Sequence, residues 1–345
     1  MTAPGRPPAT WRGFNLCEMF LVEHDPRWQE MTPSGRGKFF REDFCWIADF
    51  GFNYVRLPLC YHWWGDPKHP KTLREEALEP VDRAVEWAAE NGLDLSINFH
   101  HVPGFCVNQG LRDEHLPPEP WDLWTHPEGA EVLAHHWETF ARRYAAAGPY
   151  LSFNILNEPA RCSRSDHERV IRRAVQAIRH VDADRRIVVE GFNVGADPCP
   201  ELSDLGCIQS CRGYWPGEIT HHRLWWSWAS DAPVPEWPDP GRSSGDGTFT
   251  REGLDQRYTA WKAFARQGHA VICGELGCSH LLPHPVALRW LEDELDVLNA
   301  AGFGWCLWNF RGSFGIIDSG REDVPYADFH GHRLDTAFLE ILKRH

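Results

Sequence analysis

Short apolar runs rich in β-branched and aromatic residues alternate along this chain with longer amphipathic runs. Such alternation is typical of βα units around a parallel sheet. With eight strand candidates and no linker, we predict an α/β protein in which residues 1–345 form a single-domain (β/α)8 TIM barrel, with a doubly wound sheet as the alternative. The candidates are Trp11–Leu16, Tyr54–Leu59, Leu93–Phe99, Leu151–Leu156, Ile187–Gly191, Gly206–Ser210, Ala270–Gly274 and Gly304–Asn309.

Apolar residues recur at steps of three and four in most of the longer runs, which predicts helices. The predicted helices are Leu78–Asn91, Glu131–Ala147, His167–Val181, Arg251–Gln267, Pro285–Ala300 and Thr336–Lys343. Two segments, 102–127 and 216–250, are rich in proline and polar residues and are predicted to be long loops. Each follows a strand. In a barrel such loops lie on the C-terminal face, where barrel enzymes build their sites.

Charge and hydropathy exclude several classes of partner. The formal net charge is −14 and no run of Lys and Arg offsets it, so nucleic acid is not an expected partner. No run approaches the ~20 consecutive apolar residues that span a bilayer, so no membrane association is expected. The N-terminal segment lacks the apolar core of a signal peptide, and the 11 cysteines are expected to be reduced thiols. We therefore expect a cytoplasmic protein, with its oligomeric state open.

Two of the predicted strands end in a glutamate. The run LSFNILNEPA stops at Asn157, Glu158 and Pro159, because proline cannot donate to a sheet ladder, and AVICGEL ends in Glu275 after Gly274. Carboxyls at strand ends on one barrel face can meet across the axis. A retaining glycosidase needs such a pair about 5–5.5 Å apart, with one acid/base and one nucleophile. We predict Glu158 as the acid/base and Glu275 as the nucleophile.

The order of further motifs resembles glycoside hydrolase family 5, the cellulase and mannanase family, over nearly the whole chain. The motifs are WRGFN, GFNYVRLPL, NFHHVPG and NEP at the first four strands, Tyr214 after the sixth, GE at the seventh and LWNFRGSFGIID at the eighth. The resemblance implies a retaining hydrolase that cleaves β-glycosidic bonds in oligosaccharides or polysaccharides of the glucan or mannan type. The 18 tryptophans agree with this substrate class, since sugar rings stack on aromatic side chains.

The resemblance also implies roles for residues around the two glutamates. Arg56 would bind the nucleophile Glu275 and keep it ionised, as a nearby cation does for any carboxylate. Tyr214 would touch the same carboxylate. Asn157 would bind the sugar 2-hydroxyl, where contacts strengthen in the transition state. Trp308 would form the floor of the subsite that holds the distorted sugar.

Two positions leave alternatives open. One of the neighbours His100 and His101 is expected to face the site, and the spacing H-x-x-P-G matches His100 to the family's histidine. The family also has a histidine two residues before the tyrosine of the sixth strand, whereas this chain has Arg212 two residues before Tyr214. A guanidinium there would recognise a carboxylate or several hydroxyls of the substrate. Alternatively, Arg212 would anchor a loop through an acidic residue such as Glu218.

Two other functions compete with this hypothesis. A metal-dependent hydrolase on the same barrel would need ligands at strand ends, but the sequence has its His-x-His pair at His330 and His332, beyond the last strand. A carbohydrate-binding pseudoenzyme would keep the barrel and the aromatic cleft, but both glutamates are present. We expect neither a metal nor a cofactor. Two cysteine pairs match zinc spacings only loosely, namely Cys207-x3-Cys211 and Cys273-x4-Cys278.

Overall fold

A closed parallel barrel forms the centre of the molecule. The structure is a computed structural model that describes residues 6–22, 26–108, 121–245 and 247–345. Its eight strands follow the order β1-β10-β9-β6-β5-β4-β3-β2. Strand β1 closes the ring, because Phe14 lies opposite Leu307 of β10 on one side and opposite Val55 of β2 on the other. The predicted (β/α)8 barrel is confirmed, and the doubly wound alternative is wrong because a closed barrel leaves no sheet edge.

Each barrel strand overlaps one of the eight predicted runs. The largest difference is at β6, which continues to Gly213, so Arg212 lies inside this strand and not beyond its end. The apolar run ends earlier than the strand because the last residues of β6 point polar side chains at partners inside the barrel. The strands are β1 (Arg12–Asn15), β2 (Tyr54–Cys60), β3 (Asp94–His101), β4 (Leu151–Asn154), β5 (Arg186–Glu190), β6 (Ile208–Gly213), β9 (Val271–Leu276) and β10 (Gly304–Leu307).

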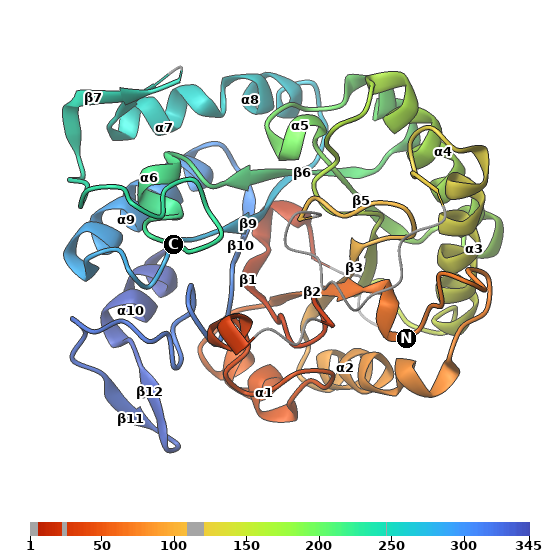
Figure 1. Cartoon of the computed structure of the whole chain (residues 1–345), viewed down its shortest axis with the longest axis horizontal. Coiled ribbons are helices and arrows are strands. Elements are labelled where there is room, and N and C mark those ends of the chain that lie inside the picture. The colour runs from red at the N-terminus through yellow and green to blue at the C-terminus, as the bar shows by residue number, and fades with distance from the viewer. Residues whose placement is uncertain (1–5, 23–25, 109–120, 246) are drawn as a thin grey trace.

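Helices surround the barrel (Figure 1). They are α1 (Arg41–Asp49), α2 (Glu79–Glu90), α3 (Pro127–Arg143), α4 (Arg164–Val181), α5 (Phe192–Gly195), α7 (Arg251–Arg257), α8 (Thr259–Ala265), α9 (His284–Ala300) and α10 (Thr336–Arg344). The short 3-10 helices are η1 (Pro8–Thr10), η2 (Pro26–Glu30), η3 (Tyr61–Trp63), η4 (Glu75–Leu78) and η6 (Pro200–Leu205). Helix α1 was not predicted. The single helix predicted over Arg251–Gln267 is two helices, α7 and α8, which are separated at Tyr258, where the backbone departs from helical angles with φ −89° and ψ 8°.

Three helices begin where a short polar side chain satisfies a free backbone N–H. Ser163 accepts from the backbone of Asp166 at the start of α4, and Asp335 accepts from Phe338 at the start of α10. Thr250 caps α7 in the same way. Such caps each contribute about 0.5–2 kcal/mol and fix the residue at which the helix starts.

The barrel interior is built in layers. Near the N-terminal ends of the strands, Trp11 stacks on Tyr54 with ring centroids 4.4 Å apart, and four smaller side chains complete this apolar floor, Val188, Ile208, Ile272 and Cys306. Residues two positions apart on a strand share a face. The next layer therefore holds the residues that follow the floor by two positions, namely Arg56, Glu190, Ser210 and Gly274. On β2 and β5 the sequence thus changes from an apolar residue in the floor to a charged residue in the next layer, which we call the charged layer.

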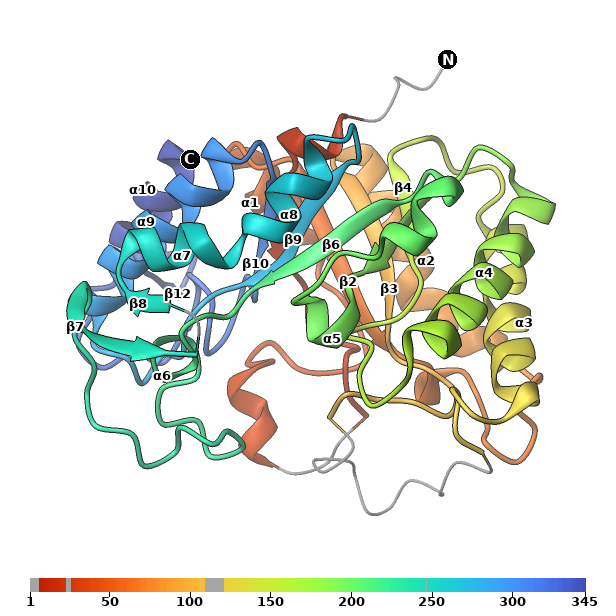
Figure 2. The ribbon, with the colours of Figure 1, turned by 90° about the horizontal axis from the view of Figure 1, so that it is seen from above.

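The segment 216–250 departs from the simple βα pattern. It contains the short helix α6 (Gly217–Thr220) and an antiparallel hairpin of β7 (Asp239–Ser244) and β8 (Gly247–Phe249), neither of which the sequence analysis predicted. Figure 2 shows α6 and this hairpin toward the lower side of the barrel, with the C-terminus toward the upper side. A second hairpin, β11 (Ala327–Phe329) and β12 (His332–Leu334), follows β10. Among the described residues, no helix has the length and apolar character needed to cross a bilayer.

The close approach of β1 and β2 gives a test of the fold. A Cβ added at Gly13 would lie 1.7 Å from the backbone oxygen of Tyr54, and this rigid backbone cannot move aside. Gly13→Ala should therefore lower the free energy of unfolding by about 1–3 kcal/mol or more. Gly241→Ala is the matched control, because the nearest atom to its added Cβ is a side-chain oxygen at 3.5 Å. Melting temperatures of the two variants measure the difference, and equal values would contradict the close packing.

Candidate active site

Arg56 lies at the centre of the charged layer, with 1% of its surface exposed. Its Nη1 donates to Oε1 of Glu275 at 2.6 Å. The contact implied for this pair by the family resemblance is therefore present in the structure. The remaining donors of the guanidinium reach four further side chains at 2.8–3.3 Å, those of Asn15, Asn154, Asn157 and Glu190. Arg56 thus joins β1, β4, β5 and β9 across the barrel axis.

Arg212 bridges the two predicted catalytic residues. Its Nε donates to Glu158 at 3.0 Å, and its Nη2 donates to Glu275 at 3.2 Å. Its Nη1 forms an ion pair with Glu190 at 2.6 Å. The other acceptors are Oδ1 of Asn157, Oγ of Ser210 and the carbonyl of Cys211. All five N–H donors of the guanidinium therefore have acceptors within the protein.

This arrangement corrects both predictions made for Arg212. Its donors are already used within the protein, so none is left to recognise a carboxylate or hydroxyl of the substrate. It does not anchor a loop through Glu218 either, since that carboxyl lies 3.7 Å from Arg242. The predicted sixth strand ends at Ser210, before Arg212, whereas β6 continues to Gly213 and carries Arg212 into the charged layer. Arg212 is a positioning residue for the two carboxyls.

Arg212 fits because two neighbouring positions have no side chain. A Cβ at Gly195 would lie 2.7 Å from Cγ of Arg212. A Cβ at Gly274 would lie 3.2 Å from its Nη1 and 2.4 Å from Oγ of Ser210. The longer arginine is therefore accommodated by Gly195 beside it and by Gly274 on the neighbouring strand.

The surroundings of Glu158 and Glu275 shift the pKa values of these two carboxyls in opposite directions. Burial raises the pKa of Glu158 to about 7, and the charge of Glu275 acts in the same direction. Burial also acts to raise the pKa of Glu275, but the charges of Arg212 and Arg56 outweigh it and hold this pKa below its usual value. Two carboxyls whose pKa values are pushed apart can serve as an acid and an anion at the same pH.

A cavity of about 290 Å³ opens onto both carboxyls. Trp308 lines it, and its ring lies 5.5 Å from that of His100, which also lines the cavity. Tyr214 donates to Oε2 of Glu275 at 3.1 Å, as the resemblance implies. Burial lowers the pKa of His100 to about 3, so this ring is neutral at ordinary pH. The remaining wall includes one further charged residue, Arg257, and is otherwise rich in aromatic rings, with Phe20, Trp28, Trp215, Trp226 and Trp261 beside residues 193–196.

Three predicted site residues lie outside the cavity wall, namely Arg56, His101 and Asn157. The ring of His101 packs against Tyr61 and His62, because successive residues of β3 point to opposite faces. Of the two neighbours, one of which was expected to face the site, His100 lines the cavity. Asn157 is fully buried, and its Oδ1 accepts from both Arg56 and Arg212. Its contact with a sugar hydroxyl stays a prediction.

Glu158 and the neighbouring wall of the cavity occupy unusual backbone conformations. Strand β4 ends at Asn154, earlier than predicted, and Glu158 has a φ of 45°. In the adjacent wall, Asn193 and Val194 have φ values of 54° and 60°, and the backbone N–H of Val194 donates to the carbonyl of Pro159. A β-branched residue in the left-handed region is strained, and such strain persists where the surroundings over-determine it. This hydrogen bond ties the wall of the cavity to the turn that carries Glu158.

The sequence analysis did not single out Glu190, the last residue of β5. It pairs with Arg212 at 2.6 Å and with Arg56 at 3.3 Å. A signal was present, because the run IVVEG ends in a glutamate followed by glycine, much as the seventh strand does. Glu190 is therefore a third strand-end carboxyl, hidden beneath Arg212 and absent from the cavity wall.

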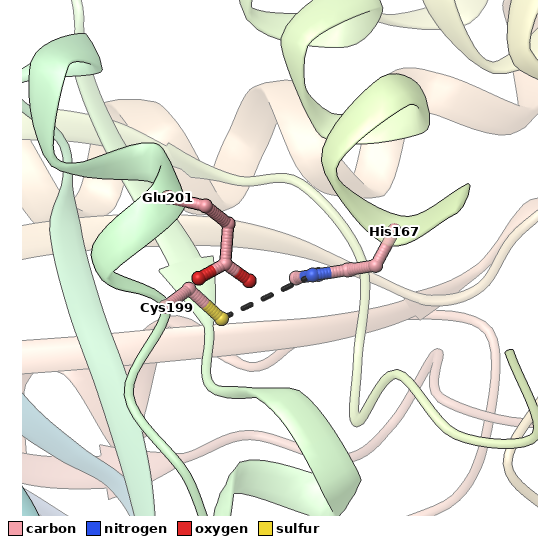
Figure 3. Close-up of side chains that lie close together, drawn as sticks. All are labelled: His167, Cys199 and Glu201. Carbon is pink, nitrogen blue, oxygen red and sulfur yellow. Dashed lines mark hydrogen bonds between the residues drawn. The ribbon is translucent and has the colours of Figure 1, made fainter. Parts of the chain in front are cut away.

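One group of potential metal ligands lies elsewhere. Among the described residues, His167, Cys199 and Glu201 place one ligand atom each within 4.8 Å of one another, as Figure 3 shows. Glu201 accepts from Arg164 at 3.0 Å, and burial raises the pKa of Cys199 to about 12, which keeps the thiol protonated. Three ligands are one fewer than a closed structural zinc site uses. The 11 cysteines, all in described segments, are free thiols.

Comparison with known proteins identifies the family. The model of the cellulase family, glycosyl hydrolase family 5, matches residues 8–313. The chain belongs to glycosyl hydrolase family 5. It is accordingly a glycoside hydrolase, and both glutamates that the family resemblance singled out lie at the cavity of this family 5 barrel.

Individual family 5 relatives agree over most of the chain. Endoglucanase C of Acetivibrio thermocellus is 23% identical over 302 residues, which cover 81% of this chain and 86% of that protein. A crystal structure described as a glycoside hydrolase is 30% identical, with a TM-score of 0.86 over 97% of this chain and 99% of the other. The endoglucanase Cel5A of Thermotoga maritima shares the fold, with 20% identity and a TM-score of 0.74 over 97% of each chain.

The buried charges around Arg212 give a test of the site. Arg212→Met leaves Glu190 and Glu275 with Arg56 as their remaining guanidinium, so it should destabilise the protein by about 3–5 kcal/mol. Adding Glu190→Gln removes the carboxylate that lost its partner. The double variant should therefore recover part of the lost stability, measured as the midpoint of urea unfolding. A double variant that is no more stable than Arg212→Met would show that Arg212 does not balance Glu190.

Proposed function

We propose that this enzyme is a retaining glycoside hydrolase that cleaves β-linked glycans of the glucan or mannan type by double displacement. Glu158 serves as the acid/base and Glu275 as the nucleophile. The observation that carries the proposal is the single guanidinium of Arg212, which contacts an oxygen of each carboxyl. This shared contact favours the separation of a retaining pair, about 5–5.5 Å, over the about 6.5–9.5 Å that an inverting pair needs to admit water.

In the first step, the protonated Glu158 gives its proton to the glycosidic oxygen while Glu275 attacks the anomeric carbon. The bond from that carbon to the leaving oxygen breaks, the leaving sugar departs as an alcohol, and a glycosyl ester with Glu275 remains. In the second step, the ionised Glu158 takes a proton from water as the water attacks the same carbon. The ester bond breaks, and both carboxyls return to their starting states.

The contacts around Glu275 support its assignment as nucleophile. It receives hydrogen bonds from Arg56 at 2.6 Å, Tyr214 at 3.1 Å and Arg212 at 3.2 Å. These donors keep the carboxylate ionised and fix the direction of its oxygens. Glu158 has one of the same donors, and its side chain is 13% exposed toward the cavity, where a leaving group can reach it.

The substrate class follows from the cavity and from the relatives. A wall that is mostly aromatic suits the apolar faces of sugar rings. Endoglucanase C and the Thermotoga enzyme are endoglucanases by name, which supports a β-glucan or a close analogue as substrate. Two arginines line the described cavity, namely Arg212, whose donors are all used within the protein, and Arg257, which is exposed. The aromatic wall and the named relatives favour a neutral glycan, and this is the substrate we propose.

Chemical rescue tests the assignment of the two carboxyls. Glu158→Ala should lose nearly all turnover on oligosaccharides, and added azide should partly restore the rate on an aryl glycoside with a good leaving group. The product should be the β-glycosyl azide, because azide replaces water in the second step and needs no base. Glu275→Ala should give no β-azide. A near wild-type kcat of Glu158→Ala without azide, or of Glu275→Ala with or without azide, would refute the assignment.

The pH dependence of kcat/KM tests the same pair. Glu158 must carry its proton in the first step, so activity should fall as pH rises through about 7, where this group ionises. The acidic limb should lie below the usual range for a glutamate, because the pKa of Glu275 is lowered. With a 2,4-dinitrophenyl glycoside, whose leaving group needs no proton, Glu158→Ala should lose the alkaline limb. An unchanged alkaline limb in that variant would assign the ionisation to another group.

A further inference from the structure

The insertion 216–250 carries three tryptophans within four residues, and they lie in different surroundings. The ring of Trp225 packs on Trp28 with centroids 5.1 Å apart, and that of Trp226 stacks on the same Trp28 at 6.1 Å. Both belong to the aromatic group beside the catalytic cavity. Trp228 has 71% of its surface exposed, the largest fraction among the large hydrophobic residues described.

Although exposed, Trp228 is held in place. Gly217 of α6 lies directly under the ring, since a Cβ there would be 2.6 Å from its Cζ2. The hydroxyl of the preceding Ser227 donates to the carbonyl of His221 at 3.0 Å and accepts from the N–H of Ala229 at 3.0 Å. The backbone on both sides of Trp228 is therefore fixed. A ring fixed before binding costs less entropy when a ligand stacks on it.

A second cavity of about 380 Å³ lies between Trp228 and the catalytic cavity. Four residues line both cavities, namely Asn108, Tyr214, His221 and Trp226. Tyr214 also donates to the nucleophile Glu275. The second cavity therefore adjoins the catalytic cavity, next to the residue that contacts Glu275.

We propose that Trp228 is the platform of an additional sugar-binding subsite, on which one ring of a neutral β-linked glycan stacks outside the catalytic cavity. This proposal rests on the proposed function. The apolar face of a sugar ring matches the indole, and the amide of Asn108 lies in the same cavity to bond sugar hydroxyls. The described wall of this cavity holds no Lys, Arg, Asp or Glu. That wall suits an uncharged sugar better than a phosphate or a carboxylate.

The test is the dependence of kcat/KM on the length of the substrate. Wild type, Trp228→Ala and Trp228→Phe are compared on an aryl β-monoglycoside and on the matching β-linked oligosaccharides of two to six sugars. Trp228→Ala should lower kcat/KM by about tenfold on oligosaccharides long enough to reach the ring, as expected for the loss of one stacking contact. The monoglycoside should change by less than about twofold, because it does not reach the second cavity. Trp228→Phe should keep part of the increase in kcat/KM that longer substrates give in wild type, because a phenyl ring can still stack on a sugar.

Val234→Ala is the matched control, because Val234 is also exposed, at 53%, on the same insertion but lines neither of these two cavities. It should leave every rate unchanged. The subsite would be overturned if kcat/KM of Trp228→Ala rose with substrate length as much as that of wild type. It would also be overturned if Trp228→Ala lowered kcat/KM equally on the monoglycoside and on the oligosaccharides. If wild type is a dimer and Trp228→Ala a monomer with unchanged length dependence, the ring belongs to an interface between copies, and the subsite is wrong.

Binding measurements separate this inference from the proposed reaction. In the background of Glu275→Gln, calorimetry with a long oligosaccharide should show a Kd about tenfold weaker after Trp228→Ala. If wild type cleaves no glycoside, the proposed reaction fails, yet this binding difference still tests the platform. If wild type cleaves glycosides but Trp228→Ala binds the oligosaccharide as tightly as its parent, the platform alone fails.

Discussion

The site depends on a mismatch of charge inside the barrel, where two guanidinium groups meet three carboxyls. Arg56 and Arg212 together contact Glu158, Glu190 and Glu275, and all five side chains are largely withdrawn from water. Two cations can compensate two carboxylates, and burying a further uncompensated anion would be costly. The third carboxyl is therefore driven to hold a proton. Glu158 is that carboxyl, because it has one of the two arginines as a partner and lies at the cavity, and the held proton is what an acid catalyst delivers.

The charged layer that contains these side chains lies between two apolar layers of the barrel. The apolar floor of Trp11, Tyr54 and their neighbours excludes water from below, which strengthens every charge contact above it. The aromatic group over the cavity, with Trp28 and Trp308, limits water from above. Between these two apolar layers, the carboxyls keep fixed directions because each donor around them is itself held by a strand.

Much of this could be predicted from the sequence, and the failures have physical causes. The strand count and the two glutamates followed from patterns of local residues, since strand-end positions in a barrel converge on one face. The same reasoning missed Glu190 because nothing local distinguishes a strand-end carboxyl that is covered from one that is open. Arg212 was assigned to the substrate because its partners come from β4, β5 and β9, which are far apart in the sequence. The end of β6 was misplaced because polar residues there are buried against charges and not against solvent.

The fit of Arg212 also bears on how this protein can be redesigned. An arginine at this position needs Gly195 and Gly274 to leave room and Glu190 to supply a negative charge. A side chain at Gly195 would collide with the arginine, and one at Gly274 would collide with Ser210 beside it. The loss of Glu190 would leave the guanidinium without its shortest ion pair. A design that changes any one of these four positions therefore has to treat them as a set.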